Sequence, residues 1–306
     1  MPGTISYFHL VVKCSNAHLQ VTAKDYLQTH ILYASHQYVH EHIRRSLMVS
    51  SSNQGTQIME HLYGFNVVKA VLTCKSRQHI NRLFVHCNLK DNPKLTKSAL
   101  QTKVDQIIDL ARLENIPIVH ASKLELNRKA HDRPNQNMVL EATPAKICVS
   151  ESGPVSGRNL LLHNVGDPQN LGSILRTCLL MNIDHIFLSG GCSQLSPVVA
   201  KASSGALEHY LRHKAISQVA GLTRFLESTR VPIMAAVCKG DPNSISTTNT
   251  TGLICVGSEG AGLPGAITSK ATTLVTLPMA RSDLVDSFNI SVATALLINK
   301  LFSSSS

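Results

Sequence analysis

The chain has 306 residues, and its 29 Lys and Arg against 19 Asp and Glu give a formal net charge of +10 with neutral histidines. With 43% hydrophobic and 16% charged residues, disorder is excluded as the main state, and the length predicts about two domains. No apolar run approaches the roughly 18 residues of a membrane-spanning helix, so we expect a protein that does not cross a membrane. The absence of Trp argues against base stacking on a sheet as the main mode of nucleic-acid binding. The positive charge favours a polyanionic partner, although a basic protein without such a partner has the same composition.

Eight cysteines are scattered along the chain, and none belongs to a CxxC pair. Several lie in apolar runs such as LICVG and AAVCKG, which is typical of small buried side chains in a reducing compartment. The spacing does not indicate a zinc knuckle or a disulfide scaffold, and we expect no metal site. The eight positions are Cys14, Cys74, Cys87, Cys148, Cys178, Cys192, Cys238 and Cys255.

Residues 1–57 differ from the rest of the chain. Only two acidic residues, Asp25 and Glu41, lie before the polar run SSSNQG. The pair Arg44 and Arg45 suits an organelle transit segment, but arginine is otherwise sparse and no secretory pattern is present. We expect a mostly disordered leader.

Three histidines surround Glu41 in this leader. His36 and His40 have the spacing of one helix face, which would suit a metal site with His42 nearby. No further ligand cluster accompanies them, so solvated histidines are the favoured interpretation.

The pattern of residues 58–143 predicts a small α/β domain. The segments GFNVVKAVL and SALQTKVDQIIDLARLEN have helical patterns, whereas INRLFVHC, IPIVHA and MVLEAT have strand patterns. Basic residues flank these elements and form either an RNA platform or an ordinary solvated face. They are Lys69, Lys75, Arg77, Arg82, Lys90, Lys94 and Lys97.

Residues 144–158 are rich in Pro, Ser and Gly and predict a linker, followed by a second α/β domain at 159–303. There, near-continuous apolar runs alternate with helical patterns, which indicates strands buried on both faces of a parallel sheet. The strand candidates are NLLLHNV, HIFLSG, VPIMAAVC, TGLICVG and TLVTLP, and SFNISVATALLINKLF predicts the last helix.

The first of three polar segments in this domain is GDPQNLGSILRT, residues 166–177. Asp167 and Pro168 end a strand, Asn170 is a candidate N-cap, and Gly172 permits close backbone approach at a helix start. Arg176 follows within two turns, so both polar side chains can face a cleft at the carboxyl edge of the sheet, where open α/β sheets bind ligands. A helix cap and a surface charge explain the same residues without a ligand.

The second segment, VGSEGAGLPG at 256–265, leaves an apolar strand and contains GxGxxG from Gly260 to Gly265. A nicotinamide dinucleotide site is disfavoured, because only 41 residues follow and Glu259 would repel a pyrophosphate. The third segment, LPMARSDLVDSFNISVA at 277–293, places Ser287, Asn289 and Ser291 at a helix start. They can cap the helix or hold a substrate.

Together, N-L-G-x-I-x-R-T, V-G-x-E-G-x-G-L and L-P-M…S-F-N-I-S-V-A resemble the three-motif signature of the SpoU/TrmH family, the RNA ribose 2′-O-methyltransferases of the SPOUT superfamily. The resemblance covers about residues 159–302, and HLYGFNVVKAVL is similar to the start of the family's small substrate-binding domain. LSPVVAKASSGALEH is similar to the mitochondrial large-subunit rRNA guanosine-2′-O-methyltransferase branch. The resemblance implies S-adenosylmethionine as methyl donor, a homodimer, and a trefoil knot in the C-terminal domain.

The family's polar site residues match five positions here: Asn170 and Arg176 in the first motif, Glu259 in the second, and Ser287 and Asn289 in the third. Its cofactor contacts match Gly257, Leu277 and Phe288. The chain departs from the family at His163, where many members have Asp, at Phe288, where Leu is usual, and in NQNMV, where HQG is usual.

The resemblance implies methyl transfer from S-adenosylmethionine to a ribose 2′-hydroxyl, with guanosine of mitochondrial large-subunit rRNA as the expected target and tRNA as the alternative. It favours a mitochondrial location over a cytoplasmic one. A non-catalytic RNA-binding or ribosome-assembly factor on the same fold is the alternative from another functional class, but intact motifs disfavour it. The five polar residues suit positioning and charge stabilisation during methyl transfer.

Overall fold

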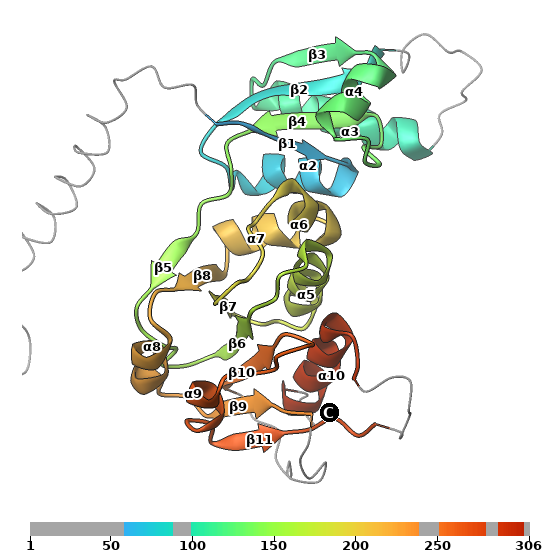
Figure 1. Ribbon diagram of the computed structural model, residues 1–306. Helices are drawn as coiled ribbons and strands as arrows, with labels where there is room; N and C mark the ends of the chain where they lie inside the picture. Colours follow the sequence, from blue (N-terminus) through green and yellow to red (C-terminus); the bar gives the residue numbers. More distant parts are fainter. Residues whose placement is uncertain (1–57, 88–98, 239–250, 280–286, 303–306) are drawn as a thin grey trace, which may run out of the picture. The chain divides into compact units, whose positions relative to one another are not determined.

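The computed structural model describes residues 58–87, 99–238, 251–279 and 287–302, which form two sheets with their helices (Figure 1). The leader prediction and the interpretation of His36, His40 and His42 lie outside the described residues. In the described ranges, no helix has both the length and the apolarity that crossing a bilayer requires.

The smaller sheet has four strands in the order β1-β4-β2-β3, with β2 and β3 parallel and the other pairs antiparallel. The predicted helices and strands of this region are confirmed, whereas β1 and α4 were not predicted. Val104, Ile107 and Ala111 point from α3 into the core, as the helical spacing requires. The elements are β1 (Glu60–Tyr63), α2 (Phe65–Cys74), β2 (Ile80–His86), α3 (Ala99–Leu113), β3 (Ile118–Ala121), α4 (Lys123–Lys129) and β4 (Met138–Ala142).

The larger sheet has seven strands in the order β11-β9-β10-β6-β7-β8-β5, and every pair is parallel, as predicted. Its strands are β5 (Cys148–Ser150), β6 (Arg158–His163), β7 (His185–Ser189), β8 (Ala215–Val219), β9 (Ile233–Ala236), β10 (Gly252–Gly257) and β11 (Thr273–Val275). Its helices are α5 (Pro168–Leu180), α6 (Pro197–Ala202), α7 (Ala206–Arg212), α8 (Leu222–Ser228), α9 (Gly265–Thr268) and α10 (Ile290–Phe302). The predicted trefoil knot stays a prediction, because residues 239–250 and 280–286 of this domain lie outside the described residues.

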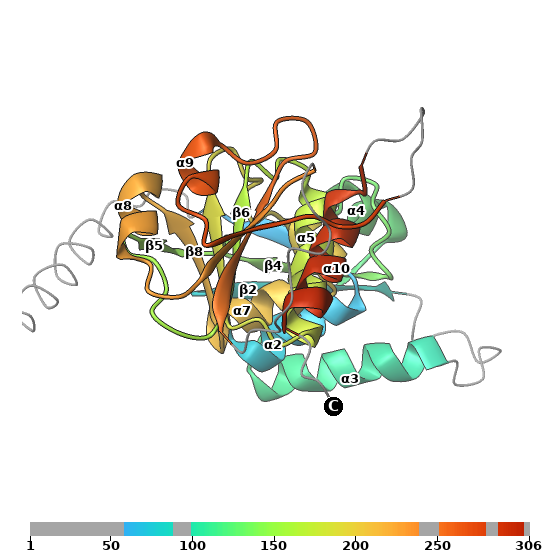
Figure 2. The same ribbon diagram turned by 90° about the horizontal axis from the view of Figure 1, so that it is seen from below.

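Helices cover both faces of the larger sheet, which explains its near-continuous apolar strands. Leu160 and Leu162 of β6 pack in one core with residues of α5, α7 and α10. Leu161 between them packs in a second core with Phe225 of α8 and Ile267 of α9. Figure 2 shows α8 and α9 on one side of the strands and α5 and α10 on the other. Successive side chains of a strand point to opposite faces, so both faces need apolar residues.

The segment predicted as a linker contains a strand of the larger sheet. β5 pairs with β8 in parallel, with Cys148 opposite Ser217 and Ser150 opposite Val219. The prediction missed β5 because its three residues are exposed or half-buried and carry no apolar pattern. An edge strand is held mainly by backbone hydrogen bonds, which the side-chain pattern does not report.

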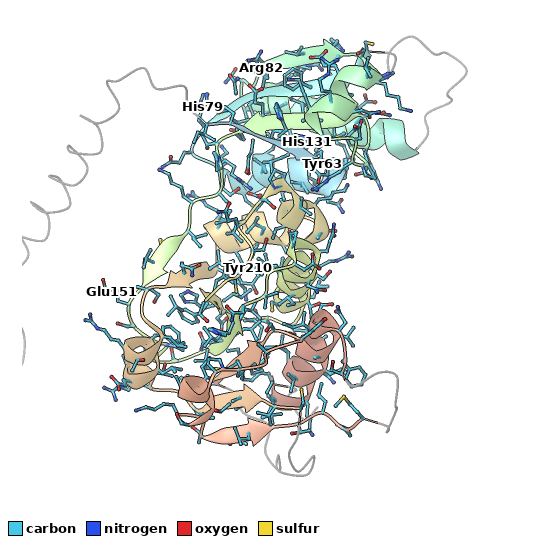
Figure 3. The ribbon with its side chains drawn as sticks, viewed as in Figure 1. Tyr63, His79, Arg82, His131, Glu151 and Tyr210 are labelled. Atoms are coloured by element: carbon cyan, nitrogen blue, oxygen red, sulfur yellow. The ribbon has the colours of Figure 1, made fainter. Side chains whose placement is uncertain are left out.

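A buried ion cluster joins the two sheet domains. Arg77, after α2, donates to Glu208 of α7 through Nε at 2.9 Å and Nη2 at 2.6 Å, and to Glu60 through Nη1 at 2.5 Å. The side chains of Arg77 and Glu208 are both 0% exposed. Arg77 is therefore a structural residue and not part of an exposed RNA platform. Tyr210 lies on the same helix as Glu208 and is also buried (Figure 3). Its hydroxyl donates to the carbonyl of Ile183 at 3.0 Å.

The cysteines agree only in part with the expectation of burial. Cys178 and Cys255 are buried, and burial raises the pKa of both thiols. Cys148 and Cys238 are exposed. In the run AAVCKG, strand β9 ends at Ala236, so Cys238 lies beyond the buried strand.

Candidate functional site

The three sequence motifs meet at the carboxyl edge of the larger sheet. Because the strands are parallel, the end of β10 at Gly257 and the residues after β6 and β11 emerge at the same edge. α5 follows β6, and Leu277 comes two residues after β11. This is the edge at which open α/β sheets bind ligands.

Asp167, rather than Asn170, caps the start of α5. Its carboxylate accepts hydrogen bonds from the backbone N–H groups of Gln169 at 3.1 Å and Asn170 at 3.2 Å. Pro168 occupies the first turn, where its missing N–H costs nothing. The N-cap prediction for Asn170 is wrong, because α5 begins at Pro168 and Asn170 already lies within its first turn. The side chain of Asn170 is consequently available for other contacts.

Asn289 connects all three motifs. Its Nδ2 donates to Oδ1 of Asn170 at 3.0 Å and to Oε1 of Glu259 at 3.1 Å. The same Oε1 accepts the backbone N–H of Ile290 at 2.8 Å. A carboxylate at the first turn of α10 is also favoured by the helix dipole. Residues distant in the sequence thus form one polar cluster, which we call the motif cluster: Asn170, Glu259 and Asn289.

Asn289 also caps α10. Its Oδ1 accepts the N–H of Ser291 at 3.0 Å and the hydroxyl of Ser291 at 2.6 Å, and its carbonyl accepts the N–H of Ala293 at 2.9 Å. Capping and substrate contact were the two alternatives for these polar residues. The side-chain oxygen of Asn289 caps α10, while its side-chain nitrogen faces the other two motifs. Ser291 was named with Ser287 and Asn289 as a residue that caps the helix or holds a substrate, but it was not one of the five positions matched to the family's site.

A glycine turn follows β10. A Cβ on Gly257 would lie 2.1 Å from the carbonyl oxygen of Gly262, and this backbone contact excludes any side chain. The N–H of Gly262 bonds to the carbonyl of Ser258 at 2.9 Å, and Gly262 has a φ of 63°. A Cβ added to Gly260 would meet no other atom within 4 Å. The turn therefore presents bare backbone at the carboxyl edge, as a bound ligand with close backbone contacts requires.

Two apolar side chains accompany the glycine turn. Leu277 is half-buried against the main core, and Phe288 is 38% exposed directly before Asn289. Ser287, which directly precedes Phe288, is half-buried. An exposed aromatic ring beside polar groups can cover an apolar part of a ligand.

Arg176 lies on the same helix as Asn170 but has a different contact. Its Nη1 donates to the hydroxyl of Ser204 at 3.4 Å, and the side chain is exposed. Six residues along an α-helix correspond to a rotation that leaves the two side chains about 120° apart. Within one chain, the described contacts join Asn170 to the motif cluster and do not join Arg176 to it.

His163 ends β6, where the sequence departs from the family. Its Nδ1 lies 2.9 Å from Oγ of Ser189 at the end of β7. Burial lowers the pKa of this imidazole. The histidine is thus held against the neighbouring strand by the hydroxyl.

Gly172 on α5 has a packing role. An added Cβ would lie 2.4 Å from Cβ of Ala202 and 2.8 Å from the carbonyl of Val199. The predicted close backbone approach at the helix start is confirmed. It is α6 that approaches, which fixes the helix that carries Asn170.

Two family profiles match the chain. The profile of the SpoU rRNA Methylase family matches residues 157–299, and the profile for RNA 2′-O ribose methyltransferase substrate binding matches residues 61–148. Similar solved structures include an RNA 2′-O ribose methyltransferase, at 20% identity and TM-score 0.64 over 80% of this chain and 88% of that chain. An AdoMet-bound rRNA methyltransferase from Sinorhizobium meliloti has 20% identity and TM-score 0.62 over 79% and 86%. These two likenesses show the fold.

Three relatives illustrate the range of similar proteins. The rRNA methyltransferase 1, mitochondrial, of Saccharomyces cerevisiae is 28% identical over 80% of this chain and 70% of its own length. The protein of the same description from Homo sapiens is 26% identical over 81% and 74%. A 23S rRNA (guanosine-2′-O-)-methyltransferase from Haemophilus ducreyi is 25% identical over 78% and 95%.

Proposed function

The chain belongs to the SpoU/TrmH family of RNA 2′-O-ribose methyltransferases, and we propose that it methylates a guanosine of mitochondrial large-subunit rRNA. The observation that carries the catalytic part is the motif cluster, because Asn289 joins the three motifs at the ligand-binding edge of the sheet. The names of the relatives support the finer part: two are mitochondrial rRNA methyltransferases, and one acts on guanosine of 23S rRNA.

The residues beside the motif cluster fit S-adenosylmethionine. The bare backbone of the glycine turn suits the polar parts of this cofactor, and the apolar surfaces of Leu277 and Phe288 suit its uncharged parts. When bound, the cofactor supplies a methyl group already activated by its attachment to a sulfonium. Gly257, Leu277 and Phe288 are the residues that would hold it.

The motif cluster positions the ribose. Among the described residues, Oε1 of Glu259 receives both of the hydrogen bonds given above, and we assign Oε2 of the same carboxylate to accept a hydrogen bond from the incoming 2′-hydroxyl. Asn170 and Asn289 hold each other in place through a hydrogen bond of 3.0 Å. Ser287 lies two residues before Asn289 in the third motif. Correct orientation of a weak nucleophile accounts for a large part of the rate that such a site supplies.

Arg176 stabilises the negative charge that develops on the ribose oxygen. A guanidinium remains protonated at neutral pH, so it serves as a charge stabiliser or a phosphate contact and not as a base. It does not contact the motif cluster within its own chain, and in a homodimer the partner subunit's Arg176 would complete the site. Exposed apolar residues on α10 and α5 support such a dimer: Val292, Leu296 and Leu180.

Replacement of Arg176 tests this assignment. We expect Arg176→Ala to reduce methyl transfer to a large-subunit rRNA transcript by about 10²–10³-fold, which is typical of losing one charge-stabilising group. Arg224→Ala is the matched control, since Arg224 is also an exposed helix arginine but lies on α8, on the other side of the sheet. Full activity of a folded, dimeric Arg176→Ala protein would contradict the role of Arg176.

The substrate is tested in cells that lack the protein. Ribose-methylation mapping should show loss of one guanosine modification in mitochondrial large-subunit rRNA, restored by the wild-type chain and not by Arg176→Ala. Loss confined to a tRNA would instead assign the alternative substrate. Calorimetry that detects no binding of S-adenosylmethionine to the purified protein would support a non-catalytic ribosome-assembly factor.

A further inference from the structure

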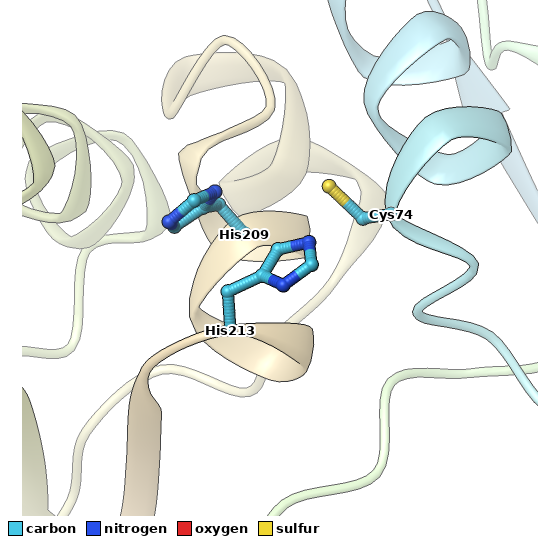
Figure 4. A group of neighbouring side chains, drawn as sticks. All are labelled: Cys74, His209 and His213. Carbon is cyan, nitrogen blue, oxygen red and sulfur yellow. The ribbon is translucent and has the colours of Figure 1, made fainter.

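A cluster of one cysteine and two histidines lies where the two domains meet, apart from the three motifs. Cys74 is the last residue of α2, His209 lies on α7, and His213 follows the end of α7. One ligand atom from each residue lies within 4.8 Å of the other two. Figure 4 shows the sulfur of Cys74 facing the two imidazoles across the gap between the helices.

The local structure explains why these side chains converge. A spacing of four residues places His209 and His213 on the same side of α7, and their ring centroids are 4.9 Å apart. Cys74 comes from the other domain, but α2 and α7 are held together by the buried contacts of Arg77 with Glu208. Arg77 and Glu208 are close neighbours of Cys74 and His209 in the sequence, so the backbone on both sides of the cluster is anchored.

The imidazoles are suited to act as ligands. In the part of the chain that the structure describes, neither imidazole forms a side-chain hydrogen bond or an ion pair. Binding of a metal ion would displace the thiol proton of Cys74, which would be released to solvent.

We propose that Cys74, His209 and His213 bind one Zn²⁺, with water as the fourth ligand, and that this ion links the substrate-binding domain to the methylase domain. One thiolate and two imidazoles form a borderline donor set that suits zinc. Tetrahedral bonds of about 2.0–2.3 Å place ligand atoms roughly 3.3–3.6 Å apart, so the side chains must close in by about 1 Å. Half-buried and exposed side chains have the freedom to do so. The site is independent of the proposed catalytic function.

Zinc content of the reduced, full-length protein tests the proposal. After equilibration with Zn²⁺ and removal of free metal, wild type should retain about one zinc per chain by elemental analysis. Cys74→Ser and His213→Ala should each lose this zinc. Cys148→Ser and His120→Ala are matched controls that should retain it, because both residues are exposed and lie elsewhere.

Two further measurements exclude a folding artefact. His213 is exposed, so the metal-free His213→Ala protein should melt at the same temperature as metal-free wild type, while added Zn²⁺ should raise the melting temperature of wild type only. Cobalt in place of zinc should give a thiolate charge-transfer band in wild type that is absent in Cys74→Ser. Zinc content no higher than in the cluster variants, or a cobalt spectrum unchanged by Cys74→Ser, would overturn the proposal.

Discussion

Glu208 and Glu259 each receive several hydrogen bonds, and the two glutamates differ in their access to solvent. Glu208 accepts a bidentate pair from Arg77, and both side chains are 0% exposed. Glu259 accepts from Asn289 and from the backbone of Ile290, and both Glu259 and Asn289 are exposed. Similar chemistry thus occurs in two opposite environments.

The difference separates a structural cluster from a functional one. Two buried charges balance each other, and removing one leaves the other without compensation in a medium that solvates it poorly. Water replaces lost contacts in an exposed cluster, so the same hydrogen bonds add little to the free energy of unfolding. The exposed cluster keeps polar atoms available for a substrate. We therefore expect stability to depend on the first cluster and activity on the second.

The largest expected effect is on stability. Arg77→Ala should lower the free energy of unfolding by about 3–5 kcal/mol, because Glu208 and Glu60 lose their buried partner. Urea denaturation followed by circular dichroism measures this change. Arg82→Ala is the control: Arg82 pairs with Glu141 but its side chain is 45% exposed, so the loss should stay near 0–1 kcal/mol, about the value of a surface pair. Equal losses in the two variants would break the comparison.

The next effect is on activity. Asn289→Asp keeps the Oδ1 that caps α10 but replaces the Nδ2 donor to Asn170 and Glu259 with a second carboxylate oxygen. Methyl transfer should fall by roughly 10²-fold, since misplaced groups cost about this much, while the free energy of unfolding changes by less than about 1 kcal/mol. Asn182→Asp, an exposed amide that accepts from Lys214, is the matched control and should retain full activity. A stability loss that accounts for the lost activity would place Asn289 in the structural class.

The smallest effect is a pH dependence. Burial lowers the pKa of His185 to about 4 from 6.5, and its ring stacks on Phe187 and contacts the hydroxyl of Ser217. The unfolded chain therefore binds more protons than the folded chain between these two pH values. The stability that depends on a neutral His185 is fully present above pH 6.5 and is lost as the pH falls toward about 4. The free energy of unfolding, measured by urea titration from pH 7 to pH 4, should fall less steeply in His185→Gln than in wild type. His131→Gln, at an exposed position, should leave the slope unchanged.

Much of the fold follows from the apolar pattern of the sequence. Buried strands such as β6 and β10 are continuous apolar runs, and their parallel pairing is what helices on both faces require. β1 and β5 escaped prediction because they are short and lie at sheet edges, where side-chain burial is incomplete. Backbone pairing with a distant strand determines such segments.

The site shows the same division between local and distant information. The motifs identified Asn170, Glu259 and Asn289, but which residue caps α5 depended on backbone geometry, and Asp167 takes that role. The charge of Arg77 gave no sign of burial, because its partner Glu208 is far away in the sequence. The same distance concealed the proximity of Cys74 to the histidines of α7.

The position of β5 has a practical consequence for separating the two domains. β5 precedes residue 157, where the match to the methylase profile begins, yet it forms the outer edge of the methylase sheet. A truncated protein that starts at 157 would uncover the hydrogen-bonding groups of β8 and expose them to intermolecular pairing and aggregation. A soluble isolated methylase domain should therefore begin before Cys148 and retain this strand.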